Sequence, residues 1–135
     1  MKKKICIVVS NYYPVISKNL LNGANKTLKK YDFKSIKIVY APGVFEIPFI
    51  ISKLIKKYDA FIALGCVIKG KTPHFDFISN SSINGIMNLS ILYKKPIVNG
   101  ILTCNNKKQA LDRSNPFKKN KGGETAKAII SIMKI

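Results

Sequence analysis

The chain has 135 residues and a formal net charge of +18, and hydrophobic residues make up 47% of it. This length predicts one domain over residues 1–135, and the hydrophobic fraction excludes an intrinsically disordered chain. No apolar run approaches the ~20 residues of a membrane-spanning helix, so we expect no membrane partner.

The positive charge comes almost wholly from lysine, since the chain has 23 Lys and one Arg. A nucleic-acid-binding protein usually employs Arg for bidentate contacts, whereas these lysines are scattered over many segments. Lys, Asn and Ile are abundant together, as in chains encoded by codons rich in A and T. We therefore expect no nucleic-acid partner, and nucleic-acid binding remains an alternative that rests on the charge alone.

The first half of the chain alternates between strand and helix patterns. Residues 5–9 form a continuous apolar run, typical of a buried parallel strand and too short for the core of a signal peptide. A helical stripe follows over residues 19–31, and residues 36–40 predict a second strand. Residues 46–58 have the clearest helical spacing, with Pro48 in the first turn, where its missing N–H does no harm.

The second half continues the alternation. The patterns predict a strand over residues 60–68, a loop over 70–73, a helix from His74 or Phe75 to Tyr93, and a strand over 97–103. Two further helices are predicted, one capped by Asn105 and running to about residue 114, the other over 125–133 after a basic connection. This order predicts a flavodoxin-like three-layer α/β/α sandwich with a four-stranded parallel sheet.

In such folds the binding site lies in the crevice at the carboxyl ends of the strands. One segment that follows a predicted strand is the loop before His74, the only histidine. Gly70 permits close backbone approach, and the helix start with Lys71 beside it favours a phosphate. His74 could transfer protons near neutral pH. The alternative is a plain turn with a capping Thr72 and an exposed His74.

Other rare polar types also follow strands or end helices. Glu46 could accept hydrogen bonds from the hydroxyl groups of a polyol, or it could only complement the helix dipole. Tyr12 could stack on a flat heterocycle, or it could pack at the sheet edge. Arg113 and Lys121 could bind an anion, although Arg113 could also stabilise the end of its helix.

The three cysteines, Cys6, Cys66 and Cys104, lie far apart, and each adjoins an apolar run. We expect buried, reduced thiols and a cytoplasmic location, because disulfides are rare in reducing compartments. With one His and no cysteine cluster, we expect no metal site.

Three motifs in this order resemble the 6,7-dimethyl-8-ribityllumazine synthase family. Residues 42–48, PGVFEIP, are similar to the family's PGAFEIP, and residues 65–76, GCVIKGKTPHFD, to LG-x-VI-[RK]-G-x-T-x-H-[FY]-[DE]. The third motif is QALDR at 109–113 followed by NKG at 120–122. The resemblance runs from Ile5 almost to the C-terminus.

The resemblance implies a transferase that condenses 5-amino-6-(D-ribitylamino)uracil with 3,4-dihydroxy-2-butanone 4-phosphate, without a cofactor or metal. It implies that His74 transfers protons. By the same resemblance, the pyrimidine contacts are Tyr12, Val44, Phe45, Glu46, Cys66, Val67, Ile68 and Asn99, and the butanone phosphate contacts are Lys71, Thr72, Arg113 and Lys121.

The family resemblance also implies a homopentamer with sites between adjacent subunits. Tyr12, Glu46 and His74 would come from one subunit, and Asn99, Arg113 and Lys121 from its neighbour. Some members assemble twelve pentamers into a hollow shell of 60 subunits, and association with riboflavin synthase is a further expectation. Asn99 stands where the family commonly has Phe, which supports one alternative, a non-catalytic module that binds flavin or lumazine.

Overall fold

The computed structural model describes residues 2–135 and contains four strands with helices on both sides. The strands are β1 (Ile5–Ser10), β2 (Ile36–Ala41), β3 (Ala60–Ile68) and β4 (Ile97–Cys104). The helices are α1 (Pro14–Lys30), the short 3-10 helix η1 (Val44–Glu46), α2 (Ile47–Leu54), α3 (His74–Tyr93), α4 (Lys107–Ser114) and α5 (Lys121–Met133).

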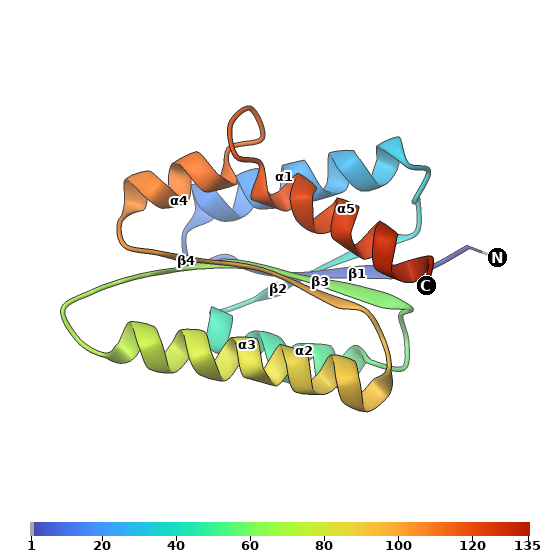
Figure 1. Ribbon diagram of the computed structural model, residues 1–135, viewed down its shortest axis with the longest axis horizontal. Coiled ribbons are helices and arrows are strands. Elements are labelled where there is room, and N and C mark those ends of the chain that lie inside the picture. Colours follow the sequence, from blue (N-terminus) through green and yellow to red (C-terminus); the bar gives the residue numbers. More distant parts are fainter. Residues whose placement is uncertain (1) are drawn as a thin grey trace.

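The four strands form one parallel sheet in the order β2-β1-β3-β4. Helices α1, α4 and α5 cover one face, and α2 and α3 cover the other (Figure 1). This confirms the predicted three-layer sandwich, with the strand order of the flavodoxin-like fold. The carboxyl ends of β3 and β4 lie on the left of Figure 1, where the loop before α3 extends outward.

Burial explains why β1 and β3 have continuous apolar sequences. All six residues of β1 are buried, and so are the first seven of β3. Alternate side chains enter two cores, with Ile7 packing towards α1 and α5 and Val8 towards α2 and α3. Within residues 2–135, no helix is long and apolar enough to cross a membrane.

Several predicted boundaries were wrong, although every predicted element exists. Helix α1 begins at Pro14 rather than residue 19, because Pro at the first helical position favours the helix conformation. Helix α2 ends at Leu54, four residues before the predicted end. The cap of α4 is Asn106, whose Oδ1 accepts the Gln109 N–H at 2.9 Å, rather than Asn105.

Helix α5 begins at Lys121, four residues before the predicted start at Thr125. Its cap is Asn120, which has a positive φ of 47° and accepts the Gly123 N–H on its side chain at 3.1 Å. Gly122 and Gly123 were predicted to belong to the basic connection before this helix, but both are helical and buried. The tertiary contact with α1 outweighs the low helix propensity of glycine at this point.

The contact between α1 and α5 requires glycine at Gly122. A Cβ on this residue would lie 2.0 Å from the Leu20 carbonyl oxygen, which belongs to the backbone of α1 and cannot rotate away. On the facing helix, a Cβ on Gly23 would lie 2.4 Å from Asn120 Oδ1. The two helix axes can therefore approach closely only because these positions lack side chains.

We predict that Gly122→Ala lowers the free energy of unfolding by about 3 kcal/mol, because the added methyl group forces α5 away from α1. Urea denaturation measures this change. The matched control is Gly70→Ala, where an added Cβ meets nothing within 4 Å, and we expect a change within about 0.5 kcal/mol. Equal stability of the two variants would contradict the packing described for α1 and α5.

Candidate active site

A pocket of about 390 Å³ opens at the carboxyl edge of the sheet. Its walls come from the segment after β1, the turn at η1, the end of β3 and the first turns of α3. Eight residues predicted from the sequence line it: Tyr12, Val44, Phe45, Glu46, Cys66, Val67, Ile68 and His74. Because carboxyl ends of parallel strands meet at one edge, residues that are distant in the sequence meet here.

Gly65 allows η1 to approach β3, and Gly43 leaves room for the side chain of Glu46. A Cβ on Gly65 would lie 2.9 Å from Val44 Cγ2, so the buried Val44 packs directly onto the strand. A Cβ on Gly43 would lie 2.9 Å from Glu46 Oε1, so the carboxylate folds back over this glycine. Glu46 thus presents hydrogen-bond acceptors at the pocket wall.

The wall formed by β3 is nearly neutral. Burial raises the pKa of the Cys66 thiol to about 12, and the neighbouring Cys104 thiol, within hydrogen-bonding reach, adds to the increase. The thiol therefore keeps its proton at neutral pH and is a poor nucleophile. Cys66 can shape the pocket and form weak polar contacts, but it is unsuited to covalent catalysis.

His74 is the first residue of α3 and is exposed at the mouth of the pocket. Its backbone N–H reaches Thr72 Oγ1 at 3.4 Å, which is a long contact rather than a strong cap. Lys71 and Thr72 are exposed in the loop before α3 and do not line the pocket. The imidazole has access to a ligand in the pocket and could give or take a proton there.

The cations predicted near the C-terminus form a second pocket of about 350 Å³. Arg113 and Lys121 line it together with Lys119 and the end of β4. Arg113 Nη1 donates to Cys104 Sγ at 3.8 Å, and Lys121 Nζ lies 3.4 Å from Glu124 Oε1. Three cations around one hollow have the chemistry to bind an anion, and Glu124 supplies the one negative charge among the lining residues.

Asn99 lines neither pocket. It lies on the edge strand β4 in register with Ala63, and its Oδ1 accepts the Ile101 N–H at 2.9 Å. A single chain therefore does not bring Asn99, Arg113 or Lys121 to the pocket that holds His74.

Sequence reasoning missed several lining residues. Tyr13, Gly43 and Ile78 belong to the first pocket, and Glu124 to the second. Ile78 could have been found, because it lies one helical turn after His74. Within residues 2–135, no group of three or more His, Cys, Asp or Glu side chains is placed to hold a metal ion.

Comparisons of this chain with known proteins all indicate the same family. The family model described as 6,7-dimethyl-8-ribityllumazine synthase matches residues 2–135. Proteins of that name from Vesicomyosocius okutanii and Buchnera aphidicola are each 42% identical, over 98% and 99% of this chain and 84% and 87% of theirs. The protein of that name from Limosilactobacillus reuteri is 37% identical over 98% of this chain and 88% of its own.

We predict that thiol reagents fail to label the native protein at pH 8. All three cysteines are buried, and burial raises the pKa of Cys6 to about 11, an increase that Lys37 partly offsets. Titration with an aromatic disulfide reagent should release less than ~0.1 equivalent within minutes, and all three thiols in guanidinium. Rapid labelling of the native protein would contradict the closed wall at β3 if the labelling were lost in Cys66→Ser and kept in Cys6→Ser.

Proposed function

The chain belongs to the 6,7-dimethyl-8-ribityllumazine synthase family, a transferase of riboflavin biosynthesis, and we propose that the pocket at the carboxyl edge is its active site. There 5-amino-6-(D-ribitylamino)uracil would condense with 3,4-dihydroxy-2-butanone 4-phosphate to give 6,7-dimethyl-8-ribityllumazine and phosphate. The observation that carries this proposal is the convergence of Tyr12, Glu46 and His74 from three separate segments on one pocket.

The pyrimidine substrate fits the chemistry of this pocket. Tyr12 is 70% exposed, so the face of its ring is available to stack on the heterocycle. The Glu46 carboxylate would accept hydrogen bonds from the ribityl hydroxyl groups. Phe45 and the end of β3, from Cys66 to Ile68, would enclose the ring.

The reaction needs orientation and proton transfer rather than a strong nucleophile. The 5-amino group attacks the ketone carbon and water leaves, which forms an imine. Loss of the C3 proton then expels inorganic phosphate from C4, and the resulting C3 enol becomes a carbonyl. Attack by the ribitylamino nitrogen on this new carbonyl closes the ring with loss of a second water. His74 would transfer protons in these steps, and holding both substrates together would supply much of the rate.

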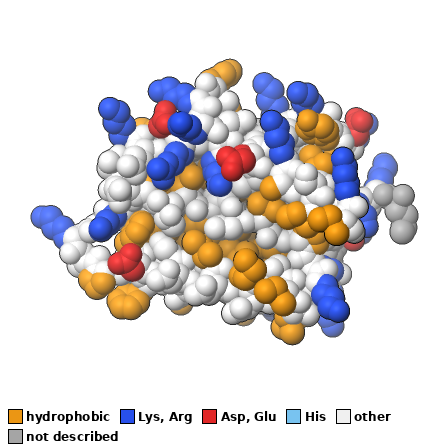
Figure 2. Space-filling model, viewed as in Figure 1, with side chains coloured by type: hydrophobic (Ala, Val, Ile, Leu, Met, Phe, Trp, Pro, Cys, Tyr) orange, Lys and Arg blue, Asp and Glu red, His pale blue; other side chains and the backbone are white. Residues whose placement is uncertain are grey.

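The phosphate site is proposed to need a second subunit. Lys71 and Thr72 would contact the phosphate from the same chain, and Arg113 and Lys121 from the neighbour. Support comes from the separation of the two pockets within one chain. Figure 2 supports it further, because hydrophobic side chains form a band across the face over β4, between α3 and α5, with Lys and Arg side chains above it and at its ends.

We propose that this band forms the subunit contact of a homopentamer. Exposed apolar side chains on α3 include Met87, Ile91 and Leu92, and such patches are typical of interfaces. Asn99 lies on β4 beside this band and would face the neighbouring site. A 60-subunit shell and association with riboflavin synthase would build on this ring, and free buried thiols agree with a cytoplasmic location.

The direct test is to mix purified protein with both substrates and follow the absorbance and fluorescence of the lumazine. We predict turnover above the uncatalysed background, and a decrease in kcat of roughly 10²-fold in His74→Ala. The control is Lys53→Ala, an exposed change on α2 away from both pockets. A wild-type rate equal to the background would remove the proposed activity, and an unchanged kcat in His74→Ala would remove the role of His74.

Mixing two impaired variants tests whether the site is shared between subunits. Arg113→Ala should raise KM for the phosphorylated substrate, and His74→Ala should lower kcat. If one subunit supplies His74 and the next Arg113, mixed rings regain intact sites at about a quarter of their interfaces, since each position is filled at random. We therefore predict partial recovery after the variants are unfolded and refolded together. Activity no greater than the sum of the separately refolded variants would show that both residues act within one chain.

A further inference from the structure

Tyr13 occupies a rigid position at the active-site pocket. Tyr13 directly precedes α1, whose first residue is Pro14, with a φ angle fixed by its ring. The carbonyl oxygen of Tyr13 accepts the Ser17 N–H at 2.9 Å. The Ser17 hydroxyl donates in turn to the Ser10 carbonyl at the end of β1. These bonds join the start of the helix to the strand, so the backbone at Tyr13 has little freedom to move.

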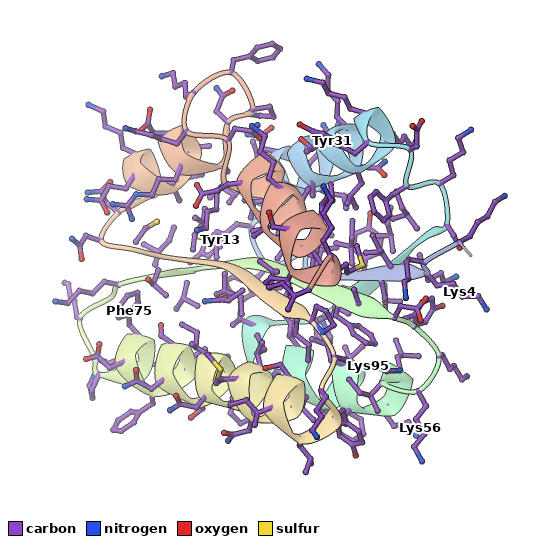
Figure 3. The ribbon with its side chains drawn as sticks, turned by 45° about the vertical axis from the view of Figure 1, so that its right-hand side comes forward. Lys4, Tyr13, Tyr31, Lys56, Phe75 and Lys95 are labelled. Atoms are coloured by element: carbon purple, nitrogen blue, oxygen red, sulfur yellow. The ribbon has the colours of Figure 1, made fainter. Side chains whose placement is uncertain are left out.

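The ring of Tyr13 orients Tyr12. The two rings meet edge to face, with centroids 5.0 Å apart and an interplanar angle of 82°. Tyr13 is half-buried and packs against the core between the sheet and α1, whereas Tyr12 extends into solvent. In Figure 3 Tyr13 lies on the same side of the molecule as Phe75 of α3, while Lys95 and Lys4 lie on the other. Tyr12 therefore stands on a fixed aromatic support.

The hydroxyl of Tyr13 remains available to a ligand. Tyr13 lines the pocket beside Cys66. Within residues 2–135, no hydrogen bond is among the causes that raise the pKa of its hydroxyl. Burial raises its pKa, with smaller contributions from Cys66 and Tyr12, so the hydroxyl keeps its proton at neutral pH. A protonated donor beside the neutral end of β3 favours a ligand that offers an acceptor there.

We propose that Tyr13 is a specificity-determining residue of the pyrimidine site, where its hydroxyl donates a hydrogen bond to a carbonyl oxygen of the uracil ring. Its own ring holds Tyr12 in position for stacking. The inference rests on the proposed function, because it needs the pyrimidine in this pocket. A heterocycle without an oxygen at this position would leave the hydroxyl unpaired when it displaced water, and would bind more weakly for that reason.

Binding of the pyrimidine substrate alone isolates this contact, because no reaction occurs without the second substrate. We expect calorimetric titration to give a dissociation constant about three- to tenfold higher for Tyr13→Phe than for the wild type. Tyr13→Leu, which also removes the support of Tyr12, should weaken binding further. The matched control is Tyr31→Phe, an exposed tyrosine at the far end of α1, which should bind as the wild type does.

Kinetics give a second, independent result. KM for the pyrimidine should rise by the same factor in Tyr13→Phe, while KM for the butanone phosphate and the melting temperature stay unchanged. If the wild type turns over and Tyr13→Phe binds the pyrimidine as tightly as the wild type does, the role of Tyr13 is overturned and the proposed function stands. If the wild type neither turns over nor binds the pyrimidine, the proposed function and the role of Tyr13 are both overturned. An equal rise in KM for both substrates would show a general distortion and also overturn the assignment.

Discussion

Close packing of α1 against α5 is the contact on which the carboxyl edge depends. Gly122 lies against the Leu20 carbonyl, and Gly23 faces the side chain of Asn120. Because Asn120 also caps α5 through the Gly123 N–H, this crossing determines where the first turn of α5 lies. Lys121 is the first residue of that turn, so the position of a cation in the second pocket follows from the absence of side chains at a helix crossing.

The two pockets have different chemistry, and the end of β4 lies between them. The first combines exposed aromatic rings with the Glu46 carboxylate and a neutral strand end, whereas the second gathers cations around Glu124. Cys104, the last residue of β4, lies near the Cys66 thiol of the first pocket and accepts a hydrogen bond from Arg113 of the second. One chain thus keeps apart a pocket whose chemistry suits a flat heterocycle and a pocket whose chemistry suits an anion, and the proposed pentamer would bring the two together.

The net charge of +18 has little bearing on this arrangement. In Figure 2 the Lys and Arg side chains lie mainly over the upper part and at the two ends of the face, while hydrophobic side chains cross its middle. Of the cations near the pockets, Lys121 is paired with Glu124 and Arg113 contacts a thiol, so both are held by specific partners. The charge would draw anionic substrates towards the surface, but the local contacts decide where a phosphate would bind.

Apolar periodicity in the sequence by itself determined the four strands, the alternation with helices and the parallel sheet, because burial on both faces demands unbroken apolar runs such as that of β1. Positions after predicted strands also indicated Tyr12, Glu46 and His74, whereas the other five predicted residues of the first pocket came from the family resemblance. Only the tertiary structure decided that Gly122 is helical and that Tyr13 shares the pocket with Tyr12. These features depend on contacts between residues distant in the chain, such as Gly122 with Leu20, which local patterns of hydrophobicity and helix propensity do not encode.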